Sequence, residues 1–338
     1  MNNFLNVIKR KNTDRMPIWI MRQAGRYLPE YLEISSKHTF LEMCHNPILA
    51  SEITKQPLDR FDLDAAILFS DILTPLIPMG IELDYLKGTG PVISNPIKNQ
   101  NDVDNLKNFS PKEKLNYIQE AITILKKDLP DDIPLLGFCG SPFTLASYMI
   151  EGGSSKTYSE TFKLLGDEKI RDSLLNFLAD HIVEYLNYKI ESGVDAVQIF
   201  ESSGGILSSN QFKEMALPYL KKVFKGIKNL NKPVSLYIHN GCHLVDVYGE
   251  VDADIASLDW RINLRKFKDE NPNIITQGNL NPSTLFAGPK NVINETKTIL
   301  DSLTEAQLKS HIFNLGHGIL PKTPIESVEA LIDFVHQY

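Results

Sequence analysis

The sequence predicts an α/β fold, a (β/α)8 TIM barrel, built by residues 1–338 as a single domain. Two observations lead to this fold class. Short apolar runs without polar alternation recur along the chain, as in parallel strands that are buried on both faces, and helical segments separate them. Polar or glycine residues follow each run directly, as they do at the active-site end of such barrels.

Eight apolar runs are the predicted strands, and each is four to six residues long. Runs of this length suit buried parallel strands, although periodicity alone also allows short buried helices. In chain order the predicted strands are residues 17–21, 65–69, 135–139, 196–200, 234–239, 254–258, 273–276 and 312–315.

The longest predicted helix covers residues 171–192. Its apolar side chains, among them Leu174, Leu178 and Ile182, recur on one face at the spacing of an amphipathic helix. Gly193 follows directly and is a helix stop, because glycine adopts the left-handed conformation that ends many helices. The next predicted strand then begins at once.

The chain is longer than the roughly 250 residues typical of this barrel. A small hairpin insertion after the second strand, at residues 81–97, accounts for part of the extra length. Residues 102–115 are predicted as a polar connection that leads into a helix over residues 116–127. A further helix is predicted from residue 143 until the paired glycines at 152–153.

The overall charge limits the kinds of partner. Lys and Arg number 35 against 42 Asp and Glu, so the net charge is −7 and no general attraction for nucleic acid or anionic membranes is expected. The amino terminus lacks the apolar core of a signal peptide, and no run approaches a membrane span, which predicts a cytoplasmic protein. The three cysteines, Cys44, Cys139 and Cys242, are predicted to be free thiols.

Polar and glycine residues gather directly after the predicted strands. In this fold the carboxyl ends of the strands form one face, so segments far apart in sequence should converge on a single cavity there. The segments are residues 22–26, 70–71, 140–142, 201–205, 240–243, 259–260, 277–279 and 316–318.

Two arginines, Arg22 and Arg26, follow the first predicted strand and indicate an anionic ligand. The guanidinium group stays charged and binds a carboxylate or a phosphate through two parallel hydrogen bonds. The alternative is a solvated pair of arginines, four positions apart on a helix, with no ligand. Since the chain is acidic overall, any anionic ligand needs such a local cationic site.

Four other side chains at strand ends or nearby are candidates, and each has a purely structural alternative. Asp71 follows an apolar run, where a carboxylate needs a partner or a wet cavity, but it also suits a helix cap. His317 lies between two glycines that allow close approach to a ligand, or is a structural histidine. Tyr148 is otherwise a core aromatic, and Ser202 a turn serine without the surroundings of a nucleophile.

A zinc site is the alternative chemistry that the residues allow. His239, Cys242 and His317 supply the three protein ligands that a catalytic zinc requires. A structural zinc would require four ligands, and the cysteines form no paired motif. Metal binding therefore remains open at this point, although no metal is the primary prediction.

Several long motifs, in order along nearly the whole chain, resemble the uroporphyrinogen decarboxylase family. The first reads MRQAGRYLPEY at residues 21–31, and the last reads FNLGHGILPKTP at residues 313–324. Between them lie matching segments at residues 68–73, 137–153, 195–202 and 277–282.

The resemblance implies an enzyme that needs no cofactor and converts the four acetate side chains of uroporphyrinogen III to methyls. The products are coproporphyrinogen III and carbon dioxide, and the pathway is haem biosynthesis. The resemblance also implies a homodimer of single-domain barrels. By motif position it implies substrate contacts at Arg22, Gln23, Ala24, Arg26, Asp71, Tyr148, Ser202 and His317.

The family's chemistry agrees with these residue types. Decarboxylation of a pyrrole acetate needs an electron sink, which a pyrrole ring protonated at carbon provides. Asp71 would stabilise that cation, and the arginines would hold the substrate's carboxylates. Arg22 is the hypothesised aid to protonation, and a water or a substrate group relayed through Tyr148 is the competing donor.

Two other functions are compatible with the predicted fold. A zinc-dependent methyltransferase acting on a thiol with a corrinoid partner would need thiolate and imidazole ligands, and it would leave Arg22 and Arg26 without a task. A noncatalytic tetrapyrrole carrier would use the arginines alone. Asp71 argues against a carrier, because a carboxylate repels an anionic ligand unless a cation must be stabilised.

Overall fold

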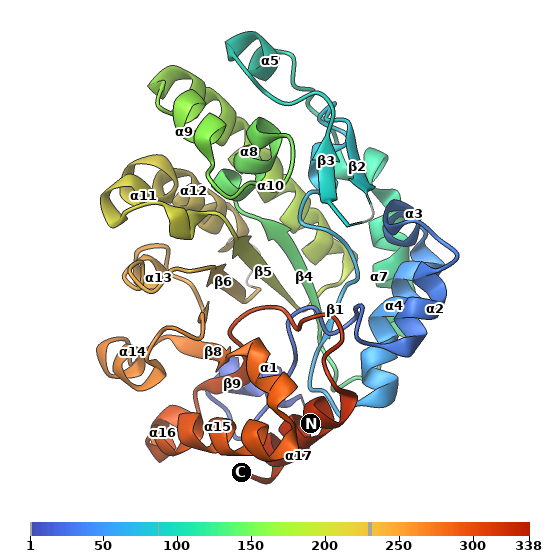
Figure 1. Ribbon diagram of the computed structural model, residues 1–338, viewed down its shortest axis with the longest axis vertical. Helices are drawn as coiled ribbons and strands as arrows, with labels where there is room; N and C mark the ends of the chain where they lie inside the picture. Colours follow the sequence, from blue (N-terminus) through green and yellow to red (C-terminus); the bar gives the residue numbers. More distant parts are fainter. Residues whose placement is uncertain (1, 87, 229–231) are drawn as a thin grey trace.

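The computed structural model describes residues 2–86, 88–228 and 232–338. Across these residues, seven strands form one sheet whose spatial order equals their chain order, and every neighbouring pair is parallel. Figure 1 shows the strands grouped at the centre with helices around the outside. This arrangement is that of an α/β barrel, as predicted. The strands are β1 (Ala66–Ile67), β4 (Leu135–Gly140), β5 (Ala196–Glu201), β6 (Val234–Ile238), β7 (Ile255–Ser257), β8 (Ile275–Leu280) and β9 (His311–Leu315).

The first predicted strand, residues 17–21, is wrong in detail. It forms a single parallel bridge, between Ile18 and Phe313 of β9. On its other side, the Asp64 N–H donates to the Ile18 carbonyl at 2.8 Å. The segment therefore joins β9 to the residues before β1 and closes the barrel, but it does so without forming a regular strand.

Side chains explain why this segment makes no regular ladder. The N–H groups of Ile18, Ile20 and Met21 donate to side-chain oxygens, of Asp64 at 2.9 Å, Gln23 at 3.1 Å and Asn314 at 2.9 Å respectively. Pro17 has no N–H to give. The Trp19 N–H donates to the Phe313 carbonyl of β9 at 3.4 Å, and the other amides of the segment are bound by side chains or missing.

The other predicted strands are present with shifted ends. β1 spans two residues of the predicted five because the Phe69 N–H donates to the Thr54 hydroxyl at 2.8 Å and leaves the ladder. β8 begins two residues later than predicted and extends to Leu280. Polar side chains interrupt the apolar pattern in its second half, so the pattern did not predict that part as strand.

Helices surround the sheet. The longest, α10 (Glu168–Ser192), begins at Asp167, whose carboxylate accepts from the N–H groups of Lys169 and Ile170, and ends at Gly193, where φ is 120°. The others before α10 are α1 (Asn3–Ile8), α2 (Pro29–Ser35), α3 (Phe40–His45), α4 (Pro47–Arg60), α5 (Gln100–Asp104), α6 (Pro111–Lys114), α7 (Asn116–Asp128), α8 (Pro142–Glu151) and α9 (Ser159–Leu165).

The later helices follow the same alternation. They are α11 (Ser209–Met215), α12 (Leu217–Lys228), α13 (Val247–Glu250), α14 (Leu264–Glu270), α15 (Pro289–Asp301), α16 (Glu305–Leu308) and α17 (Ile325–Gln337). Short 3-10 turns are η1 (Thr74–Leu76), η2 (Gly204–Ile206) and η3 (Pro282–Ala287). The segment expected to be a polar connection, residues 102–115, contains the end of α5 and the whole of α6.

The region predicted as a hairpin, residues 81–97, contains two antiparallel strands, β2 (Leu83–Leu86) and β3 (Gly90–Ile93). Residue 87, inside this region, lies outside the described residues. The hairpin is fixed against the end of α8, because the Ile93 N–H donates to the Gly152 carbonyl at 2.9 Å. Figure 1 shows β2 and β3 beside the barrel, away from the main sheet.

The inside of the barrel is filled. Trp19, Leu136, Tyr237 and Ile312 are among the buried side chains that pack there. The Trp19 indole N–H donates to Gln277 Oε1 at 2.9 Å, within this filled interior. A ligand is therefore accommodated at the end of the barrel and not through it.

No helix among the described residues is long and apolar enough to cross a membrane. The cysteines are unpaired, with Cys44 and Cys139 buried and Cys242 exposed.

Candidate active site

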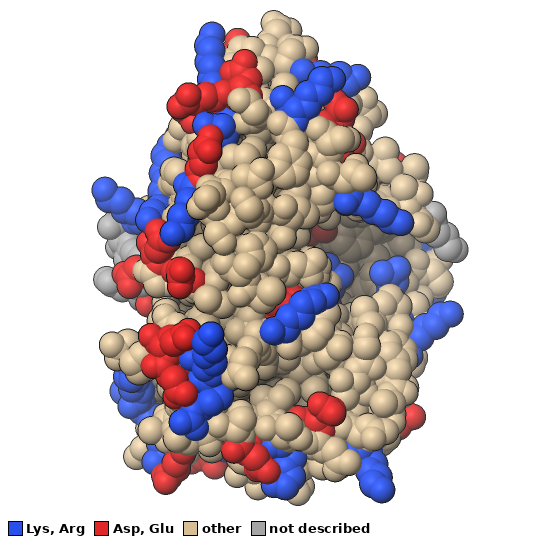
Figure 2. Space-filling model, turned by 60° about the vertical axis from the view of Figure 1, so that its left-hand side comes forward, with Lys and Arg blue, Asp and Glu red and all other residues tan. Residues whose placement is uncertain are grey.

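One face of the molecule is hollowed, and Lys and Arg side chains lie in the hollow and along its rim (Figure 2). Seven of the eight segments that the sequence predicts to converge lie at or after the carboxyl ends of the parallel strands, and the first, residues 22–26, follows the segment that bridges in parallel to β9, so they lie at one end of the barrel. Positive charge in a recess of a protein with net charge −7 is the local cationic site that an anionic ligand requires.

Arg22 lies on a loop that the surrounding residues fix closely. Its backbone has φ 64°, a left-handed conformation that costs a non-glycine residue about 1–2 kcal/mol. Asn314 holds the preceding Met21 N–H, and Gln23 donates through Nε2 to the Ala65 carbonyl at 3.0 Å. The Arg22 side chain itself is exposed. The loop therefore presents a free guanidinium from a rigid base.

Gln23 has a different position from the one that its predicted role suggests. It is buried, with 1% of its surface exposed, and both ends of its side-chain amide bind the main chain of the protein. Its side chain therefore holds the Arg22 loop. Ala24 packs, half-buried, against the apolar cluster that contains Tyr27 and Leu28.

The two glycines beside His317 have separate functions. A Cβ on Gly316 would lie 2.3 Å from the Trp260 nitrogen, and a Cβ on Gly318 would lie 2.3 Å from Cδ of Arg22. The contact at Gly316 is with backbone, so only glycine allows that packing, whereas a side chain at position 318 would displace the Arg22 side chain from its present place. The loop consequently brings the His317 imidazole next to both Trp260 and Arg22.

His317 and His239 form a pair of neutral imidazoles. Their ring centroids are 4.6 Å apart. Burial and then the charge of Arg22 lower the pKa of His317 to about 3. Burial also lowers the pKa of His239, although the nearby Asp259 carboxylate opposes this. At neutral pH the His317 ring is a neutral imidazole. It can donate a hydrogen bond to a ligand through its one N–H, but it is not the imidazolium that would act as an acid.

Asp71 caps a turn and also faces the site. Its Oδ1 accepts from the Leu73 N–H at 2.7 Å, just before η1, so the structural alternative is partly correct. Burial raises the pKa of Asp71, whereas the Tyr85 hydroxyl, the Leu73 N–H and the charges of Arg22 and Lys189 oppose that rise. The carboxylate therefore lies within electrostatic reach of the Arg22 guanidinium.

Two tyrosines lie beside Asp71. Tyr148, half-buried on α8, has a pKa raised by burial and by the Asp71 charge and lowered by Arg22. Tyr85, on β2, faces the same carboxylate and packs against Phe40 with ring centroids 4.6 Å apart. The Tyr85 hydroxyl influences Asp71 without meeting the geometry of a regular hydrogen bond, and it is buried and unpartnered among the described residues.

Tyr85 was not predicted from the sequence. Its hairpin reads as an insertion, and alternation along a strand does not tell which element the strand will cover. The signal in the sequence was weak: one tyrosine between an aspartate and a leucine. Tyr85 enters the site because the hairpin bonds to the end of α8, the helix that carries Tyr148.

Ser202 is held in place by a buried carboxylate that the sequence analysis treated only as part of a loop. Glu201 accepts hydrogen bonds from the Ser141 hydroxyl, from Thr144 Oγ1 at 2.6 Å and from the Gly204 N–H at 2.8 Å. Thr144 Oγ1 also accepts from the Ser202 N–H at 2.8 Å. Burial raises the pKa of Glu201, and these donors oppose the rise. Glu201 thereby joins the end of β5 to the start of α8.

Arg26 lies at the edge of this group. Its side chain is exposed, and burial raises the pKa of Tyr31 while the Arg26 charge opposes that rise. The structure thus brings Asp71, Tyr148 and His317 each within electrostatic reach of Arg22, and it brings Asp71 within reach of Tyr148. It places Ser202 on the adjoining loop.

The zinc ligands that the sequence allows are not assembled. In residues 2–86, 88–228 and 232–338, no group of three or more His, Cys, Asp and Glu side chains is arranged to hold a metal ion. The Cys242 thiol is exposed, and His239 Nδ1 is 3.2 Å from the Tyr237 hydroxyl, with which it shares a hydrogen bond. The two imidazoles contact each other without the thiolate.

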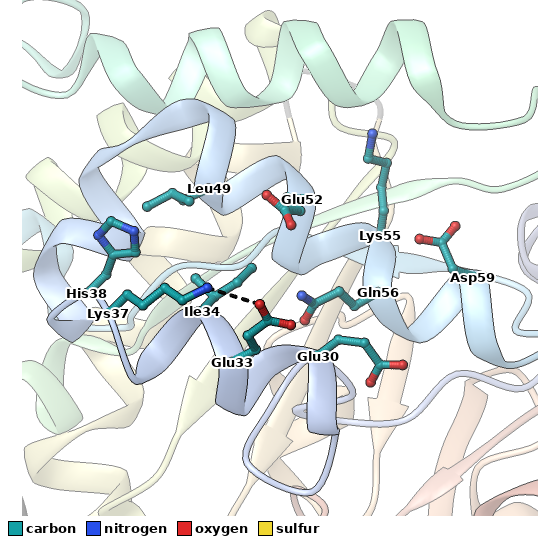
Figure 3. A pocket seen from close by; sticks show the side chains of 10 residues that line it. All are labelled: Glu30, Glu33, Ile34, Lys37, His38, Leu49, Glu52, Lys55, Gln56 and Asp59. Atoms are coloured by element: carbon teal, nitrogen blue, oxygen red, sulfur yellow. Dashed lines mark hydrogen bonds and ion pairs between the residues drawn. The ribbon is translucent and has the colours of Figure 1, made fainter.

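A separate pocket of about 540 Å³ lies between α2 and α4 (Figure 3). Glu30, Glu33, Glu52 and Asp59 line it, and Lys37 pairs with Glu33 at 3.0 Å. No predicted site residue lines this pocket, and its acidic lining is unsuited to an anionic ligand. A second cavity of about 570 Å³ lies near Arg15 and is also distant from those residues. The predicted site residues therefore lie apart from both pockets.

Comparisons with known proteins cover the whole chain. A family model described as uroporphyrinogen decarboxylase (URO-D) matches residues 1–338. The uroporphyrinogen decarboxylase of Geobacter metallireducens is 43% identical over 339 residues, covering 99% of this chain and 98% of that protein. The uroporphyrinogen decarboxylase of Carboxydothermus hydrogenoformans is 42% identical over 339 residues, covering 99% and 96%.

Among solved structures, a methyltransferase from Methanosarcina mazei is similar with a TM-score of 0.78. The similarity covers 99% of this chain and 97% of that chain, at 18% sequence identity. Identity this low shows a shared fold alone.

Proposed function

The chain belongs to the uroporphyrinogen decarboxylase family, and from that premise we propose that it converts uroporphyrinogen III to coproporphyrinogen III by removing carbon dioxide from the four acetate side chains. The observation that carries this function is the full-length match to uroporphyrinogen decarboxylases at 42–43% identity. The local group of Arg22, Asp71, Tyr148 and His317 agrees with it, since it combines a cation for a carboxylate with a carboxylate for a cation.

Asp71 is the residue that we propose to stabilise the reaction's cation. A proton adds to the pyrrole carbon next to the one that bears the acetate, and the resulting conjugated ring cation is an electron sink. The carbon–carbon bond to the carboxylate then breaks, carbon dioxide leaves, and the electron pair forms an exocyclic double bond to the ring. A proton then adds to the exocyclic carbon, the first proton leaves the ring carbon, and a methyl group on an aromatic pyrrole results. Asp71 is already fixed by the Leu73 N–H, so it meets the ring cation with little reorganisation.

Arg22 is proposed to hold the carboxylate that departs. Its guanidinium lies against Gly318 and is fixed on a loop whose amides are bound by side chains. Holding the acetate also offsets the repulsion between that carboxylate and Asp71. Arg26, at the edge of the site, is proposed to bind a carboxylate farther from the reacting ring.

Tyr148 is the proposed relay for the proton. Burial raises the pKa of its hydroxyl, so it remains protonated beside Asp71 at neutral pH. Arg22 is a weaker candidate as an acid because a guanidinium gives up its proton very reluctantly. The neutral His317 and the Ser202 hydroxyl, together with the backbone of the loop at Gln23 and Ala24, are proposed as hydrogen-bonding contacts to the substrate.

The assembly and the location are also proposals. Family membership supports a homodimer of single-domain barrels, each spanning residues 1–338, acting in the cytoplasm. Light scattering of the purified protein tests the dimer: a mass of twice 38.2 kDa is expected, and a mass of 38.2 kDa at working concentration contradicts it.

The function is tested by anaerobic incubation of the protein with uroporphyrinogen III, followed by oxidation and chromatographic counting of carboxyl groups. Stepwise passage from eight carboxyls to four is expected. Asp71→Asn should abolish it, whereas Asp84→Asn, an exposed carboxylate on β2, should leave it unchanged. An unconverted substrate with folded wild-type protein would refute the proposed function, and stoichiometric zinc in that protein would favour the methyltransferase alternative.

A further inference from the structure

A short loop after β7 brings another arginine to the same group of side chains. Its first residue, Asp259, has none of its surface exposed. The side-chain amide of Asn279 donates to the Asp259 carbonyl at 3.2 Å and to the Ile262 carbonyl at 2.8 Å. The loop is thus fixed at both ends, and Arg261 lies between these two anchors.

The Arg261 guanidinium is held in one orientation. Its Nη1 donates to Asp259 Oδ1 at 3.0 Å and to Oδ2 at 2.9 Å. Its Cζ lies 3.9 Å from the centroid of the Trp260 ring. A planar cation stacked on an aromatic face and tied at one nitrogen has little freedom left to lose on binding a ligand.

The remaining edge of this guanidinium is free. Among the residues that the structure describes, Nε and Nη2 of Arg261 donate to no protein atom, and 45% of the side chain is exposed. Asp259 accepts other donors as well, from the N–H groups of Asn240 at 3.1 Å and Arg261 at 2.9 Å. The Nε and Nη2 edge is one of the two edges with which arginine binds a carboxylate through parallel hydrogen bonds.

The charges of Arg261 and Arg22 influence the same two imidazoles, those of His317 and His239. The charges of both arginines lower the pKa values of His317 and His239. Geometry agrees, since the Trp260 ring lies 6.5 Å from each of the two imidazole rings. Arg261 therefore belongs to the wall of the site that holds His317.

We propose that Arg261 binds a carboxylate of the substrate through its Nε and Nη2 edge, and so adds a cationic contact on the β7 side of the site. This rests on the proposed function only in that the ligand is a polycarboxylate. Arg261 is a binding residue, and the reacting ring is served by Asp71 and Arg22. The carboxylate that it takes is one that stays on the substrate during a given step.

Arg261→Gln is the first test, with Arg265→Gln as the matched control. Arg265 is similarly exposed, at 42%, and also pairs with an aspartate, but its Nε is bound to Asp269 and its Nη1 to the Ser302 carbonyl. The KM for uroporphyrinogen III should rise about tenfold in Arg261→Gln, the size expected for one charge-assisted contact, with kcat within about twofold. Arg265→Gln should match the wild type.

A KM unchanged in Arg261→Gln, or raised equally in Arg265→Gln, overturns the proposal. Arg261→Lys guards against a folding defect, because it keeps a cation beside Asp259 but loses the planar edge. It should raise KM less than Arg261→Gln does, and a KM equal to that of the wild type would also count against a bidentate contact.

A second readout separates this proposal from the proposed function. Uroporphyrin III, the oxidised form of the substrate, is a fluorescent polycarboxylate that can be titrated without turnover. If the wild type binds uroporphyrin but converts no uroporphyrinogen, the proposed decarboxylase function is refuted. The uroporphyrin titration still tests the contact proposed for Arg261. Weaker binding by about tenfold in Arg261→Gln is expected, and equal binding overturns the contact.

Discussion

Strand β9 carries a histidine at its start and another just beyond its end, and their surroundings differ. His311, at the amino end, is fully buried and shares a hydrogen bond of 2.9 Å with the Thr276 hydroxyl. His317, beyond the carboxyl end, is half-buried between Trp260 and Arg22. The pKa of each imidazole is lowered to about 3, with burial as the main cause in both.

Two buried lysines show the same contrast. At the amino end of the barrel, Lys268 donates to the Thr276 and Ser310 hydroxyls and to the Ser310 carbonyl at 2.9–3.0 Å. Towards the site, Lys189 donates to the Phe138 carbonyl and otherwise lies against aromatic rings, with Nζ 4.2 Å from the Tyr185 centroid. Burial lowers the pKa of each lysine to about 8.

Polar groups at the two ends of this barrel differ in how fully they are paired. At the amino end, Lys268 bonds to Thr276 and Ser310 and contributes to stability, although Nε2 of His311 has no hydrogen-bond partner among the described residues. At the carboxyl end, the Tyr85 hydroxyl has no partner among the described residues, Arg22 is exposed, and the charges of Asp71 and Arg22 are the ones that we propose to serve a ligand. Changes at the two ends should therefore separate activity from stability.

The largest effect is expected for Asp71→Asn. Removing the charge that stabilises the ring cation should lower kcat by about 100- to 1000-fold. The melting temperature should stay the same or rise, because an amide in this buried place needs no charge compensation. Initial rates and a thermal melt check both. A loss of activity that comes with a lower melting temperature would contradict the predicted separation of activity from stability at the two ends of the barrel.

Lys268→Met is the matching change at the amino end. It leaves the Ser310 carbonyl and two hydroxyls without their buried donor, so the free energy of unfolding should fall by about 2 kcal/mol. Denaturant unfolding measures this. The kcat should stay within about twofold of the wild type, and a larger fall in kcat would show that the two ends are coupled.

Acid should destabilise the protein through both histidines. Each folded-state pKa, about 3, lies below the ordinary value of 6.5, so the unfolded chain takes up protons first as the pH falls. Their contribution to stability is complete above pH 6.5 and is lost progressively down to pH 3.

Two variants measure how much each histidine contributes to this loss of stability in acid. His317→Asn and His311→Asn should each weaken the dependence of unfolding free energy on pH in this window. His317→Asn should do so with little change in stability at pH 7, whereas His311→Asn should be destabilising there because it disturbs the Thr276 contact. Equal stability of both variants at pH 7 would contradict the contrast between the two ends.

The smallest effect is expected for Lys189→Met. The Lys189 charge lowers the pKa of Asp71, so its loss should raise that pKa. If ionised Asp71 is the active form, the acidic side of the pH profile of kcat should move to higher pH, by less than about one unit. Lys268→Met is the control and should leave the profile in place.

Several residues were predictable from sequence because chain direction alone assigns them to one end of the barrel. Asp71, Ser202 and His317 each follow a buried strand, Arg22 follows the irregular segment that bridges to β9, and parallel strands end on the same face. Tyr85 and Arg261 were not predicted. The first depends on where a hairpin packs, and the second was hidden next to the Asp259 and Trp260 that the sequence analysis noted.

The role of Gln23 shows the same limit within a single motif. Its place between the arginines suggests a ligand contact, but its amide is bound by the Ile20 N–H and the Ala65 carbonyl. Sequence position cannot tell which way a polar side chain turns. The strand predicted at residues 17–21 failed for a related reason, because side chains of Asp64, Gln23 and Asn314 take the amides that a ladder would use.

The sequence by itself determined the order of strands and helices, the end of the barrel where the candidate site residues lie and the family of the protein. Apolar periodicity and strand direction are local properties of the chain, so the order of elements and the end of the barrel can be read along it, and the long motifs indicate the family. The tertiary structure alone decided which groups contact one another: Gly316 on Trp260, Gly318 on Arg22 and Tyr85 beside Asp71. Such contacts join residues far apart in sequence, and their charges and burial set the pKa values on which the proposed chemistry depends.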